Sequence, residues 1–265
     1  FYPEDIEKID TCLLACNGAV YIMSDIYGPA DYTSVTSPAY ISKTNLVMKW
    51  AIYNGSSGTD YMGLNYYAYL KAMQSEFTFF LPSDEALQYY YDPMSFTSRV
   101  PRVMRFIYTS GNFPFATKQS NNKSVLAKYD VNSGEIVQDY PTQSMQQAEI
   151  VNRMRQLLEH NTIVHEDGIN AINTEEDEYY LSKNGMGIKV TRDETGVVKA
   201  QGGFQIENER EGLAHNHPGI LYCNVIAKNN YKNGWTFTID APLIPAARSV
   251  FSVLSNIKRG QMGEP

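Results

Sequence analysis

Few residues of this chain have the types and the spacing that catalysis or metal binding requires. The sequence contains no Gly-x-Ser-x-Gly turn, no glycine-rich phosphate loop, no His-Glu-x-x-His and no paired zinc cysteines. The densest metal-like group is His215-Asn-His217 near Glu207, Glu209 and Glu211, but it precedes Pro218 in an expected loop with solvated acids. The acidic run at 175–178 lacks the ligand spacing and turn glycine of a calcium loop. We therefore expect no metal and no cofactor.

Two histidines could take part in acid–base chemistry. His160 and His165 lie five residues apart across the end of an expected helix. A hydrolase could use one of them with a nearby acid. We expect instead that they are core or capping histidines, and the hydrolase stays the weaker alternative.

Tyrosine is the residue type that stands out, with twenty copies. Two consecutive groups are candidates for binding: Tyr66, Tyr67, Tyr69, Tyr89, Tyr90 and Tyr91. Neighbouring residues on a helix point in different directions, so each group should leave at least one ring exposed. Exposed rings stack on sugars or anchor protein partners. The alternative is that neighbouring segments cover them.

Charge and composition exclude several classes of partner. The net charge is −7 and no basic run is longer than Lys258-Arg259, so nucleic acid and anionic lipid are not expected as ligands. No apolar stretch has the length of a membrane span. The three cysteines are expected as buried small hydrophobes. Leu13-Leu-Ala-Cys16 resembles a lipoprotein cleavage box, but no basic and apolar segment precedes it, so we expect any export signal upstream of Phe1.

One phrase occurs twice and predicts the domain organisation. Asn17-Gly18 and Asn233-Gly234 each open a strand-like run that ends at a proline, and both Asn17 to Asn233 and Pro29 to Pro245 are 216 residues apart. A turn, a last strand and an exit are typical of the end of a domain. We expect the end of a preceding domain and a connection at 1–40, a complete domain at 41–257 and a tail at 258–265.

The periodicity of the remaining chain predicts an α+β fold, with helices early and strands late. Ile6, Ile9, Leu13 and Cys16 favour a helix over 5–16, and residues 32–38 look extended. Further helices are expected from Ser42, over 65–75, from Ser83 and over 144–160. Strands are expected at 77–82, within 103–140, and at 162–165, 178–182, 186–191, 196–206, 220–227 and 235–240.

Two of these segments resemble the conserved motifs of fasciclin domains. Phe77-Thr-Phe-Phe-Leu-Pro-Ser-Asp-Glu-Ala-Leu87 is similar to the first motif, a buried strand that leads through Phe-x-Pro into a capped helix. Asn233 to Pro245 is similar to the second motif. Between them, Leu157-Leu-Glu-His160 departs from the family's Tyr-His pair, because Glu159 stands where the family has Tyr.

The resemblance implies a fasciclin-like wedge of short strands packed with helices, with insertions near 92–143 and 200–220. It implies structural roles for the motif residues Thr78, Phe80, Pro82, Ser83, Asp84, Ala86, His160, Asn233, Gly234, Ile239, Asp240 and Pro245.

The resemblance also implies a function without catalysis. Tandem fasciclin proteins of bacteria are cell-surface adhesion and binding proteins, often lipoproteins of the outer membrane. We therefore expect a non-enzymatic module at the outer membrane or in the periplasm that presents loops to a protein partner, such as a nutrient-uptake complex. A carbohydrate-binding surface protein is the alternative.

Overall fold

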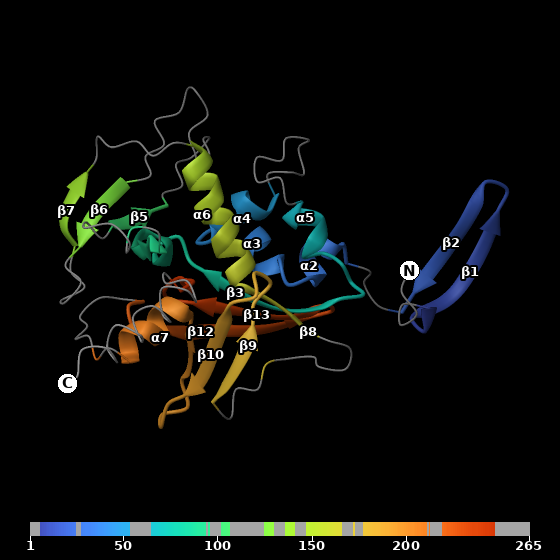
Figure 1. Ribbon diagram of the computed structural model, residues 1–265. Coiled ribbons are helices and arrows are strands. Elements are labelled where there is room, and N and C mark those ends of the chain that lie inside the picture. Colours follow the sequence, from blue (N-terminus) through green and yellow to red (C-terminus); the bar gives the residue numbers. More distant parts are fainter. Residues whose placement is uncertain are drawn as a thin grey trace, which may run out of the picture.

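The computed structural model describes residues 6–24, 28–53, 65–93, 95, 102–106, 125–129, 136–140, 147–165, 172, 177–210, 212 and 219–246. This part of the chain combines one large, mostly antiparallel sheet with several short helices, so the expected α+β class is confirmed (Figure 1).

The largest sheet has seven strands in the order β8-β3-β13-β12-β11-β10-β9 among the described residues. All neighbours in this sheet are antiparallel except β13 and β3, which run parallel. The strands are β3 (Glu76–Pro82), β8 (Thr162–His165), β9 (Glu178–Leu181), β10 (Gly187–Arg192), β11 (Val198–Gln201), β12 (Cys223–Tyr231) and β13 (Gly234–Ile239). Each of them overlaps a strand that the sequence predicts.

The two ends of this sheet meet. Ile163 of β8 forms an isolated antiparallel bridge with Ser182, which directly follows β9. The N–H of Lys183 donates to the carbonyl of Thr162 at 2.7 Å. The sheet therefore curls back on itself, so that its inner side chains are enclosed.

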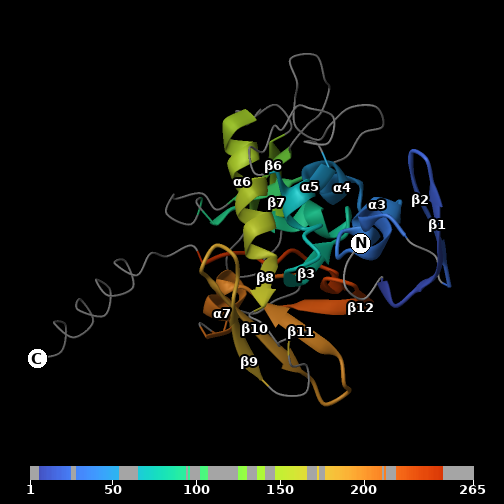
Figure 2. The same cartoon turned by 90° about the vertical axis from the view of Figure 1, so that its right-hand side faces the viewer.

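Alternation along β3 separates two hydrophobic cores. Phe77, Phe79 and Leu81 pack in the first core with residues of the helices between positions 37 and 160, which Figures 1 and 2 show on one side of the sheet. Phe80 packs in the second core with Phe237 of β13 and with residues of β10 to β12. A strand that is apolar on both faces is thus buried on both faces, as its sequence indicates.

A second sheet is formed by β4 (Tyr90–Tyr91), β5 (Arg102–Arg105), β6 (Val125–Tyr129) and β7 (Ile136–Tyr140), all antiparallel. Three of these strands lie in the region 103–140 where hairpins are expected. Tyr90, in contrast, is expected on a helix that begins at Ser83. That helix is only the 3₁₀ turn η2 (Ala86–Tyr89), because the chain then becomes extended and pairs with β5.

The remaining helices are α2 (Ala30–Thr33), α3 (Ser37–Ile41), α4 (Leu46–Tyr53), α5 (Tyr66–Tyr69), α6 (Gln147–His160) and α7 (Gly203–Arg210). The helices expected from Ser42, over 65–75 and over 144–160 correspond to α4, α5 and α6, although α5 is much shorter. The strand expected over 196–206 ends at Gln201, and α7 follows it.

The extended connection expected at 32–38 is wrong. Residues 30–33 and 37–41 are helical, and Val35 and Ala39 are buried in the first core. The carbonyl of Thr33 accepts a hydrogen bond from Lys232 N at 3.0 Å. This segment therefore packs with the region that follows it.

The helix expected over 5–16 is also wrong. Residues 9–23 form a hairpin of β1 (Ile9–Ala15) and β2 (Gly18–Met23), whose side chains are almost all exposed (Figure 1). Cys12 and Cys16 are exposed on it, whereas Cys223 is buried as expected. The helical spacing of four apolar residues misleads here because the hairpin partner, and not a core, determines the structure.

None of the described helices is both long and apolar enough to cross a bilayer.

Candidate binding surface

The two tyrosine groups that the sequence singles out lie mostly in the core. Tyr66, Tyr90 and Tyr91 are buried, and Tyr91 stacks on Phe204 with 5.5 Å between ring centroids. Burial raises the pKa of these three phenols. Tyr67, Tyr69 and Tyr89 are only partly buried. The three buried rings are enclosed and cannot act as anchors, whereas the other three keep part of their surface accessible.

Tyr67 belongs to a different aromatic group, which we call the tyrosine ladder: Tyr32, Tyr40, Tyr53 and Tyr67. Successive ring centroids are 5.4, 5.2 and 5.1 Å apart. The rings come from α2, α3, α4 and the start of α5, which lie close together (Figure 1). Tyr32 ends the ladder with 52% of its surface exposed, and Ile41, next to Tyr40 in sequence, is 61% exposed.

Two lysines lie against the ladder. Lys71 Nζ is 3.5 Å from the ring centroid of Tyr67 and forms an ion pair with Asp31 at 3.1 Å. Lys49 Nζ is 4.6 Å from the ring centroid of Tyr40 and donates to the Tyr40 carbonyl at 2.7 Å. Cations over ring faces are attracted by the aromatic quadrupole. They also occupy part of the ring faces that a sugar would need for stacking.

A hydrogen bond on the buried side of the ladder holds one of its rings in place. The hydroxyl of Tyr53 shares a hydrogen bond with Thr36 Oγ1 at 2.8 Å. Burial raises the pKa of Tyr53, and the neighbouring Tyr32 raises the pKa of Tyr40. Both phenols therefore stay neutral near pH 7 and act as apolar bodies with a polar tip. Sequence reasoning missed Tyr32, Tyr40 and Tyr53, and the tyrosine excess was the only signal for them.

Asn233, the turn residue of the second repeated phrase, holds three segments together. Its Oδ1 accepts from Val35 N at 2.9 Å, and its Nδ2 donates to the carbonyls of Leu70 and Ala72 at 2.9 and 3.3 Å. The side chain is fully buried. A structural role for this motif residue fits these contacts.

Asp84 caps a helix far away in the sequence. Its two carboxylate oxygens accept from Leu46 N and Val47 N at 3.0 and 2.9 Å, at the start of α4. A helix that begins at Ser83 would place Asp84 in its own first turn, but at that turn it is Ser83 Oγ that accepts a hydrogen bond, from Ala86 N at 3.1 Å. The carboxylate favours the positive end of α4 instead.

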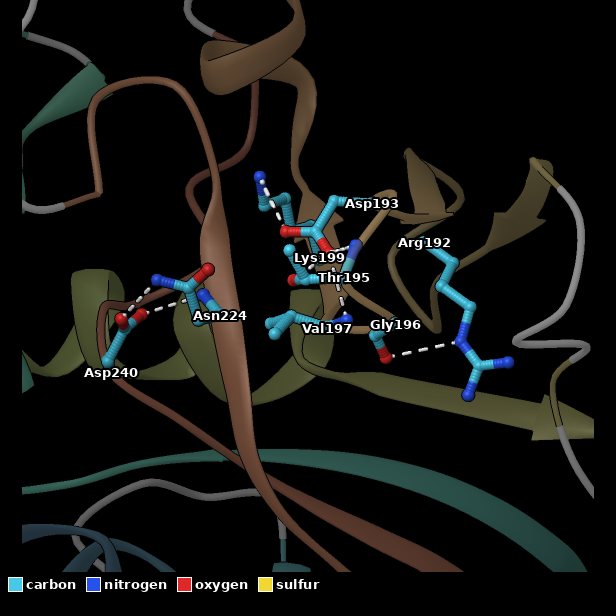
Figure 3. A network of polar contacts seen from close by, with 8 residues as sticks. All are labelled: Arg192, Asp193, Thr195, Gly196, Val197, Lys199, Asn224 and Asp240. Atoms are coloured by element: carbon cyan, nitrogen blue, oxygen red, sulfur yellow. Dashed lines mark hydrogen bonds and ion pairs between the residues drawn. The ribbon is translucent and has the colours of Figure 1, made fainter.

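Asp240 directly follows β13 and binds the neighbouring strand β12. Its carboxylate accepts from both the backbone N and the side-chain Nδ2 of Asn224 at 2.7 Å (Figure 3). Nearby in the same view, Asp193 holds the β10–β11 turn through Thr195 and Val197, and hydrogen bonds from them lower its pKa to about 2. The carboxylate of Asp193 thus stabilises a turn, and that of Asp240 stabilises the pairing at the end of β12 and β13.

The remaining motif residues are packed or paired. Thr78 Oγ1 lies 2.6 Å from His165 Nε2 across β3 and β8. The other motif positions are buried or contact neighbouring backbone: Phe80, Pro82, Ala86, Gly234, Ile239 and Pro245.

His160 is fully buried at the end of α6. Its Nδ1 lies 3.3 Å from Ser182 Oγ and 3.4 Å from Asn184 Oδ1, and its Nε2 has no hydrogen-bond partner among the described residues. Burial lowers its pKa to about 4. Such an imidazole stays neutral at pH 7 and lies out of reach of a substrate.

Gln205 is a buried polar residue that the sequence did not indicate. It lies on α7, within the insertion expected near 200–220. Its Oε1 accepts from Gly202 N and Ile244 N, and its Nε2 donates to the carbonyls of Gly219 and Pro242. Helix α7 is thus hydrogen-bonded through Gln205 to the backbone at Pro242 and Ile244, near the last described residues.

Within the described ranges, no three His, Cys, Asp or Glu side chains form a group that could hold a metal ion. His215, His217 and Glu211 of the candidate cluster, and Glu175 and Glu176 of the acidic run, lie outside the described residues.

No family model matches the chain, and no curated protein matches it. The resemblance to fasciclin domains therefore stays a prediction based on the quoted motifs.

Proposed function

We propose that this chain is a non-enzymatic binding module whose tyrosine ladder presents an anchor to a protein partner. The observation that carries the proposal is the exposed end of the ladder, where the ring of Tyr32 is 52% exposed and packs edge-on against the ring of Tyr40. Partly exposed tyrosines on a rigid base are typical of the few residues that dominate protein interfaces. The resemblance to fasciclin domains supports a place at the bacterial cell surface, where the partner could be a nutrient-uptake complex of the outer membrane.

The alternatives fit the contacts less well. A glycan would stack on ring faces, but Lys49 and Lys71 lie over two of the ladder's four rings. A hydrolase would need an accessible histidine, but His160 is enclosed and His165 is bonded to Thr78.

Site-specific photo-crosslinking in cells that make the protein tests the proposal. A photoreactive phenylalanine analogue at position 32 keeps an aromatic ring at the end of the ladder. The same analogue at Tyr179 of β9 is the control, because Tyr179 is also an exposed tyrosine, at 67% against 52% for Tyr32, and lies far along the chain from the ladder. We expect a defined protein adduct from position 32 and none from position 179.

Three results would count against the proposal. Equal adducts from both positions would show that the ladder is not the contact. Binding on a glycan array that Tyr67→Ala abolishes would favour the carbohydrate alternative. Turnover of an ester, glycan or peptide that His160→Ala abolishes would favour a hydrolase.

A further inference from the structure

Strand β12 is paired along the whole of one edge and along little of the other. β13 pairs with it from Val225 to Tyr231, whereas β11 pairs with its second edge only at Cys223 and Asn224. Beyond Asn224, no strand and no hydrogen bond among the described residues reaches this second edge. Residues 226–230 of β12 are all exposed. We call the second edge of these residues the β12 edge.

The backbone groups of Lys228 and Asn230 point toward the β12 edge. Tyr231 and Gly234 flank a two-residue turn and therefore form a hydrogen-bonded pair of the hairpin. Hydrogen-bonded and non-hydrogen-bonded pairs alternate along an antiparallel ladder, so Asn229 bonds to β13 and the residues on either side of it do not. The N–H and C=O groups of those two residues thus have no partner strand in the described part of the chain.

The side chains at the β12 edge do little to block a further strand. Edge strands that stay free are usually blunted by lysine, proline or inward charges. Lys228 is the only charged residue at 226–230, and its ammonium lies over β13, 4.5 Å from the ring centroid of Trp235 and 5.4 Å from that of Phe237. The other side chains are apolar or amides. The edge is therefore suited to accept a strand.

A second copy of the chain matches this edge in one antiparallel register. With Asn229 opposite itself across a two-fold axis, Lys228 of each copy lies opposite Asn230 of the other. Ala227 then lies opposite Tyr231. The residues with open backbone groups exchange their N–H and C=O bonds, and the two Asn229 side chains meet in a close, non-hydrogen-bonded position. An amide is self-complementary there because it both donates and accepts.

The neighbouring registers fit less well. A register centred on Lys228 would place two lysines directly opposite each other, which is destabilising. One centred on Ala227 would place Asn230 opposite Asn224, where β11 already occupies the edge. One centred on Asn230 would reach the turn of the hairpin after a single further pair. The register centred on Asn229 is thus the longest that keeps the lysines apart and avoids β11.

We infer that the β12 edge is a self-association site, at which β12 of one copy pairs antiparallel with β12 of a second copy about a two-fold axis at Asn229. The site shares no residue with the tyrosine ladder, and its formation does not depend on the proposed function. One consequence does rest on that function: a dimer carries two ladders, and linked anchors bind more tightly than single ones.

Sedimentation velocity of the whole chain measures the association, over a concentration range of about 1–200 μM because association follows mass action. The exposed Cys12 and Cys16 are replaced by serine in every sample, so that no disulfide between them joins two copies. We expect the mass to rise toward twice that of the monomer. We also expect hydrogen exchange to show new protection at the amides of Lys228 and Asn230.

Two aspartates at neighbouring positions are the decisive variants. Asn229→Asp places two carboxylates opposite each other across the axis and should weaken the dimer at least tenfold. Asn230→Asp makes the same change in net charge, but its carboxylate faces Lys228 of the second copy, so it should strengthen the dimer. Both side chains are exposed, so neither change should lower the melting temperature. A mixture of the Asn229→Asp and Asn229→Lys chains should associate, whereas each alone should not.

Cysteine cross-linking maps the register. The opposite residues of a non-hydrogen-bonded antiparallel pair lie within the distance that a disulfide bridges. In the background without Cys12 and Cys16, Asn229→Cys should therefore cross-link two copies under mild oxidation. Asn230→Cys is the matched control, and it should react at least tenfold more slowly because position 230 lies opposite Lys228 and not opposite itself.

Four outcomes would overturn the proposal. These are a chain that stays monomeric over the whole concentration range, equal effects of Asn229→Asp and Asn230→Asp, equal cross-linking at positions 229 and 230, and association that Asn229→Asp leaves unchanged. A strand of another protein captured at the β12 edge by a monomeric chain would equally overturn it, since the occupant would then not be a second copy.

Discussion

His160 shows at the residue scale how burial couples a side chain to pH. The unfolded chain should protonate this histidine near its usual pKa of about 6.5, whereas burial lowers the pKa in the folded state to about 4. As the pH falls through this window the unfolded state takes up a proton first, so stability that is present above pH 6.5 is lost toward pH 4. At about 1.4 kcal/mol per pKa unit, the loss is roughly 3 kcal/mol.

Urea unfolding of the wild type and of His160→Gln between pH 7.5 and 4.5 measures this effect. His165 and the carboxylates contribute to both proteins, so the difference between the two isolates His160. We expect the wild type's advantage in free energy of unfolding to shrink as the pH falls. A difference that stays constant over this range would show that the imidazole is accessible to protons in the folded state.

Individual contacts were the part of this molecule least open to prediction from sequence. Residue types suggested structural roles for Asp84 and Asn233, but not their partners, because Asp84 binds backbone 38 and 37 residues away and Asn233 binds Val35 198 residues away. The ladder escaped prediction for the same reason. Its four rings are dispersed over the sequence from position 32 to position 67, and only the fold brings them into contact.

At the scale of elements, strands and helices with a strong internal pattern were predictable. β3 and α6 have unambiguous apolar patterns and form as expected. The errors occur where local pattern and surroundings disagree. Residues 5–16 carry a helical pattern but pair with β2, and residues 32–38 are polar yet Ser34 and Thr36 are buried and bonded to each other at 2.9 Å.

The two hairpin turns offer a matched test of what an element's surroundings contribute to stability. Asn233→Ala leaves Val35 N and the carbonyls of Leu70 and Ala72 without their partner in the core. At about 1–3 kcal/mol for each buried group left unsatisfied, we expect a loss of roughly 2–4 kcal/mol in the free energy of unfolding. Asn17→Ala, at the equivalent position of the exposed hairpin, should cost less than about 0.5 kcal/mol.

Chemical denaturation of both variants alongside the wild type provides the measurement. If the two substitutions cost the same, the turn asparagine would act within its own hairpin and not through the helices that Asn233 contacts.

Across the whole molecule, the hairpin β1–β2 differs from the residues that follow it, because its side chains are exposed and belong to neither hydrophobic core. The first core begins in sequence at Val35, and its members continue to Ile244, so residues near both ends of this span support each other. In β1 and β2, by contrast, nearly every side chain is exposed, including Leu14 at 87%. Apolar area that is already in water contributes nothing to the stability of the rest.

Removal of residues 1–27 should therefore leave the core intact. The shortened chain keeps Thr33, whose carbonyl binds Lys232 N, and all of the residues in both cores. We expect its melting temperature to stay within about 2 °C of the full chain, and its near-UV circular dichroism to keep the core tyrosine signal. A drop of 8 °C or more, measured by calorimetry on both forms, would show that the hairpin supports the core through contacts that its exposure does not reveal.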